Sequence, residues 1–174
     1  MSDKVNIGAN LESGVGVLVG RKLRNLDGQQ RLTVNANWRH AIGADADGLT
    51  RVYLAPGVSP EGQPCLDLIP GAVIRKRYAF LEDVAEDDPL REHMAALFKS
   101  MEYKALDVQG RISIPDSFKQ YAGIENNVLM VGAGDCIQVT AATAEARDDE
   151  QVDFNKFRKA RMALADVRKQ LKKK

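Results

Sequence analysis

Two aspartate–arginine pairs are the residues of this sequence best suited to chemistry at a surface. Asp27 stands four residues before Arg31, and Asp107 stands four residues before Arg111. Across a tight turn, such residues can form a charge-assisted ion pair that fixes the loop. The same arginine could instead reach a phosphate or a guanine edge of a nucleic acid. The residues alone leave both interpretations open.

A basic cluster and two glutamines surround the first pair. Arg21, Lys22 and Arg24 precede it without an intervening acid. A basic patch with few acids is typical of a nucleic-acid binder, although charges also protect exposed edge strands. Glutamine at the tip of a turn can hydrogen-bond adenine or can remain solvated. The candidate nucleic-acid contacts are therefore Arg21, Lys22, Arg24, Asp27, Gln29, Gln30 and Arg31.

The composition argues against several classes of protein. The chain has 174 residues, a formal net charge of +1 and a hydrophobic fraction of 44%, which is typical of a globular protein. No apolar run approaches the ~18 residues of a membrane span, and no secretory signal pattern is evident, so we expect a cytoplasmic protein without a membrane partner. Two cysteines and two histidines form neither a disulfide framework nor a cluster with metal-ligand spacing. We expect no metal, no cofactor, no small-molecule substrate and no enzyme activity.

The sequence contains an internal repeat. Residues 26–43 align without gaps on residues 106–123, and five of the 18 positions are identical. The match continues through two short apolar runs in each copy, with Cys65 and Cys136 at equivalent places. Free cysteine is often buried, so we interpret both as core residues. We expect an N-terminal extension (1–15), a first repeat (16–103), a second repeat (104–165) and a basic C-terminal tail (166–174).

The periodicity of apolar residues predicts the same element order in each copy. Gly43 and Gly123 are good helix ends, and Trp38 and Phe118 are equivalent core candidates. The last helix carries a short heptad pattern, which fits docking on its own sheet or a coiled coil. The predicted strands are 15–19, 31–34, 52–54, 65–68, 111–114, 129–131 and 136–139, and the predicted helices are 36–42, 71–82, 89–103, 116–122 and 153–171.

The second copy contains the motif Asp107-Val108-Gln109-Gly110-Arg111-Ile112-Ser113-Ile114-Pro115, which resembles the signature of the AbrB-like swapped-hairpin superfamily. Two such units in one chain resemble the MraZ family of bacterial transcriptional regulators. The resemblance implies an α+β fold in which two repeats form a pseudo-dimeric swapped-hairpin β-barrel with peripheral helices. It also implies a ring-forming, nucleoid-associated homo-oligomer. This oligomer would bind double-stranded DNA at short direct repeats in the promoter of a cell-division and cell-wall operon. The family's DNA-facing pair matches Asp27 and Arg31, and the second motif supplies Asp107, Gly110 and Arg111.

The first copy departs from this motif at two positions. Gln30 replaces the glycine and Asn35 replaces the proline. Because Asp-Gly is a strong turn dipeptide, we expect Asp27-Gly28 to supply the turn. We further expect Arg31 to contact DNA and Arg111 to matter more for folding. The departures also suggest an alternative, a ring-forming structural or interaction protein with weakened DNA binding, and an antitoxin-like DNA-binding partner is a third possibility.

Overall fold

Strands and short helices alternate along the chain in the computed structural model, which describes residues 16–142, 158–160, 162–163 and 170. The predicted extension 1–15, the tail 166–174 and the helix 153–171 lie outside this description, apart from the short helical pieces within 158–170. The elements of residues 16–142 are β1 (Arg21–Asn25), β2 (Arg31–Thr33), α1 (Ala36–Ile42), β3 (Arg51–Val58), β4 (Pro64–Pro70), α2 (Gly71–Phe80), the 3-10 helix η1 (Leu81–Asp83), α3 (Pro89–Ser100), β5 (Glu102–Ala105), β6 (Arg111–Ser113), α4 (Asp116–Ala122), β7 (Asn127–Gly132) and β8 (Ile137–Ala141).

The two repeats exchange strands with each other. The six-stranded sheet has the order β1-β7-β8-β4-β3-β5, so the first strand of each repeat pairs with the other repeat. The small sheet pairs β2 with β6, and it places Arg31 opposite Ser113 and Thr33 opposite Arg111. The equivalent strands of the two repeats are β1 and β5, β2 and β6, β3 and β7, and β4 and β8. Exchanging each strand with its equivalent reverses the strand order of the six-stranded sheet and preserves the register of the small sheet. The strand pairing therefore has an approximate two-fold symmetry, and the central pair of β4 and β8 lies on its axis.

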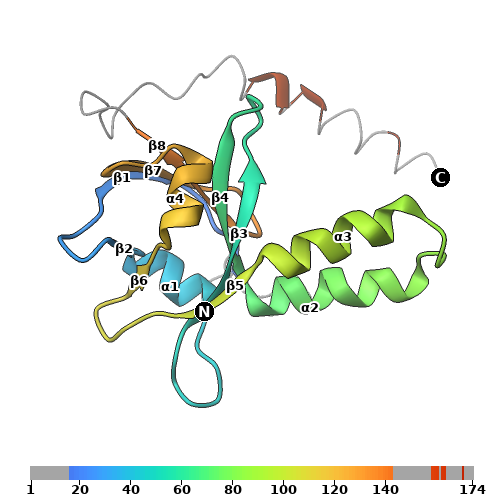
Figure 1. Cartoon of the computed structure of the whole chain (residues 1–174), viewed down its shortest axis with the longest axis horizontal. Coiled ribbons are helices and arrows are strands. Elements are labelled where there is room, and N and C mark those ends of the chain that lie inside the picture. The colour runs from blue at the N-terminus through green and yellow to red at the C-terminus, as the bar shows by residue number, and fades with distance from the viewer. Residues whose placement is uncertain (1–15, 143–157, 161, 164–169, 171–174) are drawn as a thin grey trace, which may run out of the picture.

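The six-stranded sheet is open in the part of the chain that the structure describes. Its edges are β1 and β5, and β2 and β6 form a separate pair (Figure 1). No pairing between described strands closes these sheets into a barrel. The architecture is thus a mixed α+β fold built on antiparallel sheet, and the closed swapped-hairpin barrel stays a prediction.

The main core lies between the two sheets and the two short helices. It includes Leu32 and Ile112 from the small sheet together with Trp38 and Phe118 from α1 and α4. Asn35 occupies the N-cap of α1, where its side chain accepts a 2.9 Å hydrogen bond from the backbone nitrogen of Trp38. Asparagine is a favoured N-cap residue, so the first helix begins without the proline of the second copy. Both predicted helices and both aromatic core positions are confirmed.

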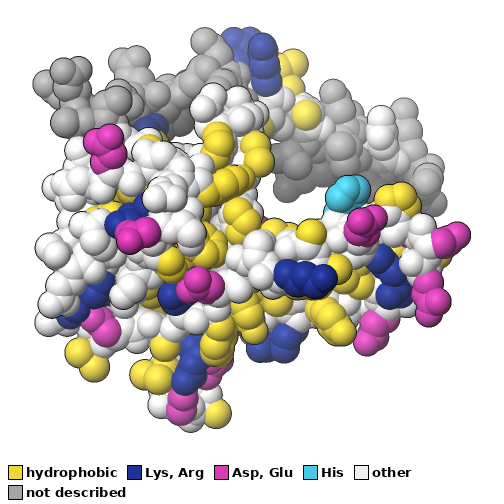
Figure 2. Space-filling view, in the orientation of Figure 1, with side chains coloured by type: hydrophobic (Ala, Val, Ile, Leu, Met, Phe, Trp, Pro, Cys, Tyr) yellow, Lys and Arg dark blue, Asp and Glu magenta, His cyan; other side chains and the backbone are white. Residues whose placement is uncertain are grey.

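A second, smaller cluster packs one helical arm against the outer face of β3 and β4. Val73 and Ile74 of α2 contact Ile69 and Ala55 there, with Leu97, Phe98 and Met101 packed around them. The α2–α3 arm projects from the body of the molecule (Figure 1). Acidic side chains dominate its far end (Figure 2), where residues 82–92 carry six acids and one arginine. None of the helices described here is long and apolar enough to cross a membrane.

Several predicted boundaries were wrong, among them those of the first strand and of the two helices of the arm. Within the described part of the expected strand 15–19, the pairing is a single bridge between Leu18 and Gly134, with Leu18 buried while Val17 and Val19 are exposed. The first helix of the arm ends at Phe80 and continues as η1. The second ends at Ser100 rather than 103, because residues 102–105 leave the helix to pair with β3.

The two cysteines are free and buried, as predicted. Cys65 lies in β4, and Cys136 lies one residue before β8, on the symmetry-related side of the central strand pair. Burial raises the pKa of the Cys65 thiol to about 11 and that of the Cys136 thiol to about 12. Both thiols are therefore protonated core residues at neutral pH.

Candidate nucleic-acid interface

Each repeat contains a tight turn that folds around an aspartate. Asp27 Oδ1 accepts hydrogen bonds of 2.9 Å from the backbone nitrogens of Gln29 and Arg31. The Gln30 backbone nitrogen donates to the Asp27 carbonyl at 2.9 Å and closes the turn. Asp107 makes the same two 2.9 Å bonds with Gln109 and Arg111. Aspartate suits this role because its side chain reaches the backbone two residues ahead.

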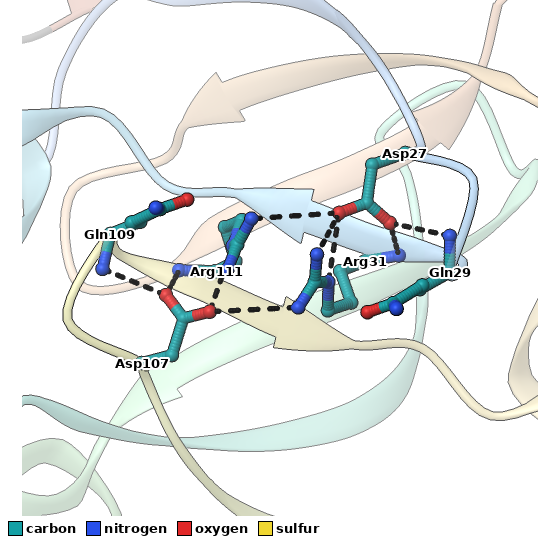
Figure 3. A network of polar contacts seen from close by, with 6 residues as sticks. All are labelled: Asp27, Gln29, Arg31, Asp107, Gln109 and Arg111. Carbon is teal, nitrogen blue, oxygen red and sulfur yellow. Dashed lines mark hydrogen bonds and ion pairs between the residues drawn. The ribbon is translucent and has the colours of Figure 1, made fainter.

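The two turns meet through a quartet of charged side chains, shown in Figure 3. Arg31 Nε donates to Asp27 Oδ2 at 2.8 Å, and Arg111 Nε donates to Asp107 Oδ2 at 2.8 Å. Each arginine also points Nη1 at the opposite aspartate, with Arg31 to Asp107 and Arg111 to Asp27 both at 4.0 Å. The four side chains are half-buried, with exposed fractions between 23% and 33%. The quartet has no net charge, and it locks the turns to one another.

This geometry matches the loop-fixing interpretation of the aspartate–arginine pairs. The hydrogen bond from the backbone nitrogen of Arg31 is the largest cause that lowers the pKa of Asp27. Burial opposes it as the next largest cause, and the hydrogen bond from the Arg31 side chain lowers the pKa further. Arg111 lowers the pKa of Asp107 in the same way. Both carboxylates are therefore ionised at neutral pH, and both arginines have the same contacts. A direct contact between Arg31 and a base stays a prediction.

The turn tips project beyond the quartet on its two sides. Gln29 and Gln109 are exposed, and Figure 3 shows them at opposite ends of the network. Val108 is 95% exposed, although it is apolar. The tips therefore offer amide groups and one small apolar side chain on a rigid base. These groups can bond base edges or contact a thymine methyl.

The turn of the first repeat uses Gln30, not Gly28, to reverse the chain. Gln30 has a φ of +58°, and the equivalent Gly110 has a φ of +77°. Asp27 and Gly28 open this turn, as expected, but Gly28 does not adopt a positive φ and the left-handed residue of the turn is Gln30. The alignment at an offset of 80 could have shown this, because it places Gln30 on the motif glycine. Gln30 also accepts a 2.8 Å hydrogen bond at Oε1 from Lys119 Nζ on α4 of the other repeat.

The basic cluster lies on β1, which is an edge strand that leads into the first turn. Among the strands that the structure describes, β1 pairs only with β7 in the six-stranded sheet. Lys22 is exposed, Arg21 and Arg24 are partly buried, and Arg24 Nη1 donates to the Leu23 carbonyl at 3.0 Å. Charges on such a strand discourage pairing with another chain and also favour phosphate. The structure brings together Asp27, Arg31, Asp107 and Arg111, and it places the basic cluster beside them in the chain rather than within the quartet.

The described residues hold no group of three or more histidine, cysteine or carboxylate side chains that could bind a metal ion.

The duplicated unit, its exchanged strands and its paired turns define a class of protein that presents two related loops on a shared base. Comparison with known proteins identifies the family within this class. The family model described as "MraZ protein, putative antitoxin-like" matches residues 97–143.

Several relatives share most of their length with this chain. The transcriptional regulator MraZ of Leuconostoc citreum (strain KM20) is 31% identical over 76% of this chain and 93% of its own. That of Caulobacter vibrioides (strain NA1000 / CB15N) is 27% identical over 84% of this chain and 88% of its own. That of Gluconacetobacter diazotrophicus is 29% identical over 78% and 86%. The chain belongs to the MraZ family, and these relatives are named as regulators rather than as enzymes.

Proposed function

We propose that this protein is a DNA-binding transcriptional regulator. The observation that carries the proposal is the pair of exposed turn tips, held in two-fold register by the Asp27–Arg31–Asp107–Arg111 quartet. The relatives' names as transcriptional regulators support it. The proposed site consists of Gln29, Gln30 and Arg31 on the first turn, with the basic cluster of β1 beside it. The turn of Asp107, Gly110 and Arg111 forms its second half.

Phosphate and base contacts have different sources in this proposal. Lys22 and Arg24 on β1 neutralise phosphates, which supplies affinity that depends on salt but not on sequence. Gln29 reads base edges from the turn tip. In each arginine, Nε bonds the turn's own aspartate at 2.8 Å, whereas Nη1 lies 4.0 Å from the opposite carboxylate. Nη1 is therefore the donor that can turn to DNA while Nε keeps the turn in place.

The proposal includes a closed homo-oligomer in which the two repeats of each chain act as a swapped-hairpin pseudo-dimer. The α2–α3 arm leaves large apolar side chains at the surface, with Tyr78 58%, Phe80 60% and Leu90 39% exposed. Exposed apolar groups on a projecting element are typical of interaction surfaces. Repeated copies of a weak site then bind short direct repeats through effective concentration. The proposed target is a promoter of cell-division and cell-wall genes.

Fluorescence anisotropy with labelled duplexes tests this proposal. One duplex carries the region upstream of the protein's own gene, and a second carries the same bases in scrambled order. We expect tighter binding to the first, with an affinity that falls steeply with salt. The substitution Lys22→Ala should weaken binding to both duplexes equally and reduce the slope of log affinity against log salt concentration by about one. Equal binding to both duplexes at every salt concentration would contradict sequence recognition.

Arg31→Ala and Arg111→Ala form a matched pair, because the two arginines have the same contacts and nearly the same exposure, 25% and 23%. We therefore expect similar losses of stability from both, and not the larger loss for Arg111→Ala that the sequence alone suggested. Arg31→Ala should in addition cost about 1–3 kcal/mol of DNA affinity and relax sequence preference. Loss of binding in folded Arg111→Ala but not in Arg31→Ala would show that the roles of the two repeats are reversed.

The neutral quartet also supports the second candidate, a ring-forming structural or interaction protein. Its arginines are neutralised within the quartet, and the first turn carries Gln30 in place of glycine. In that case, light scattering would give a mass well above the 19.1 kDa chain, while neither duplex would bind. A monomer that binds the upstream duplex would exclude this candidate.

A further inference from the structure

The two-fold symmetry places a cation of each repeat on the turn of the other. Lys119 of α4 lies against Gln30, and the equivalent residue of α1, Arg39, lies against Gly110. A Cβ atom added to Gly110 would come within 2.6 Å of Arg39 Cδ and Nε. Gly110 is buried for this reason, although the equivalent Gln30 is exposed. The two cations therefore support the two turn tips from behind.

Lys119 is fully compensated within this arrangement. Its Nζ bonds Gln30 Oε1 at 2.8 Å and pairs with Asp116 Oδ1 at 2.8 Å. Its side chain is only 13% exposed. Hydrogen bonding by Lys119 lowers the pKa of Asp116, so this carboxyl is ionised at neutral pH. The charge at this position is thus neutralised by the protein itself.

Arg39 has lost both of these partners. Ala36 stands where Asp116 stands in the second repeat, and Gly110 has no side chain to replace that of Gln30. Arg39 Nε is buried without a hydrogen-bond partner. Across residues 16–142, no carboxylate forms an ion pair with Arg39. A buried donor without a partner is unfavourable, and because Nε is enclosed by the protein, only the terminal nitrogens Nη1 and Nη2 of this uncompensated guanidinium can reach an outside acceptor.

We propose that Arg39 binds a DNA phosphate. Through this contact, the second turn, residues 107–110, is held against the DNA backbone. The inference rests on the proposed DNA-binding function and deepens it. Arginine suits this role because its planar guanidinium can donate two parallel hydrogen bonds to phosphate oxygens. Arg39 belongs to the first repeat, which also carries the basic cluster. It therefore supplies a cation to the second turn, whose own neighbouring sequence lacks a basic cluster. Both turns then hold the duplex, each supported by the other repeat.

Two substitutions test Arg39 in different ways. Arg39→Ala removes the cation, and Ala36→Asp restores the acid that Lys119 has, at the same i, i+3 spacing. Asn37→Asp is the matched control, because it adds the same charge to the same helix at a position that does not face Arg39. Asp116→Ala is the reciprocal control, which frees Lys119. Thermal melts of each variant show that it is folded.

The measurement is anisotropy with the upstream and scrambled duplexes over a range of salt concentrations. We expect Arg39→Ala and Ala36→Asp to weaken binding to both duplexes by the same factor. The dependence of log affinity on log salt concentration should become shallower by about 0.9 per engaged subunit. Asn37→Asp should have a clearly smaller effect, and Asp116→Ala should tighten binding. In the Arg39→Ala background, Ala36→Asp should do no more than Asn37→Asp.

The possible failures are distinguishable. If the natural protein binds neither duplex, the DNA-binding proposal fails and this inference fails with it. If the natural protein binds DNA, and Arg39→Ala and Ala36→Asp keep its salt slope, only the assignment of Arg39 is overturned. A rise in melting temperature with inorganic phosphate that depends on Arg39, combined with unchanged DNA binding, would show that the site takes free phosphate instead.

Discussion

Gly110→Ala is a sharp test of how the second turn is built. The backbone of Gly110 has a φ of +77°, and an added Cβ would lie 2.6 Å from the Cδ and Nε atoms of Arg39. A side chain in the left-handed region costs roughly 1–2 kcal/mol. Arg39 is flexible and can move aside, but it then loses its packing on the turn. We therefore expect Gly110→Ala to lower the free energy of unfolding by about 2 kcal/mol.

The equivalent change in the first repeat provides the control. Gln30 already adopts a φ of +58°, so Gln30→Ala keeps the strain and loses only the hydrogen bond from Lys119, which is worth about 1 kcal/mol. Gln30→Gly relieves roughly 1–2 kcal/mol of strain. It also loses that bond and adds about 0.5–1 kcal/mol of chain entropy in the unfolded state. We expect Gln30→Gly to be close to neutral.

Urea unfolding followed by tryptophan fluorescence measures these differences, because Trp38 is the one tryptophan and is buried in the core. The midpoints are compared at equal slope, so that a change in midpoint reports stability. For a chain of this size, 2 kcal/mol corresponds to a shift of roughly 4–8 °C in the melting temperature. If Gly110→Ala costs no more than Gln30→Ala, the argument from the left-handed turn and from Arg39 is refuted.

Three further predictions follow from charge and exposure. Asp27→Asn should destabilise the protein at neutral pH. Because hydrogen bonding lowers the pKa of Asp27, this loss of stability should shrink as the pH falls below about 4, and a loss that is constant with pH would contradict the prediction. Burial raises the pKa of Asp67, so the contribution of Asp67 to stability falls as the pH rises above about 4. In urea titrations, Asp67→Asn should be more stable than the natural protein at neutral pH and should lose this advantage near pH 4. Phe80→Ser on the exposed side of the arm should reduce the mass measured by light scattering without lowering the melting temperature, whereas an unchanged mass would exclude this side chain from the oligomer contact.

Local signals in the sequence were enough to predict the small helices. Asn35 before 36–42 and Gly123 after 116–122 are strong capping residues, and both helices have the predicted bounds. The end of α3 could not be found in this way. The apolar spacing that includes Leu97 continues to Met101, but the chain leaves the helix because β5 gains a partner in β3. Such a partner is distant in the sequence, and helix periodicity does not report it.

The candidate site was predicted in its parts but not in its assembly. The spacing of Asp27 and Arg31 offered an ion pair within one turn as one of two interpretations, and the structure contains that pair. The contact of Arg31 with Asp107 requires the exchange of strands between repeats, which no spacing within one repeat encodes. The residues behind the turns, Arg39 and Lys119, were missed for the same reason. Their only signal in the sequence is that they occupy equivalent positions of the repeat.

The departures from the motif are understood only when both repeats are considered together. Gln30 replaces glycine in a left-handed position, and the hydrogen bond from Lys119 in the other repeat helps to offset the strain. Gly110 keeps the motif residue, and it must stay small because Arg39 from the other repeat covers it. Each turn is therefore matched to a helix of the other repeat. A substitution in one repeat has to be judged by the side chain that the opposite repeat places behind it, and the two turns can diverge in DNA contact while the shared quartet keeps them in register.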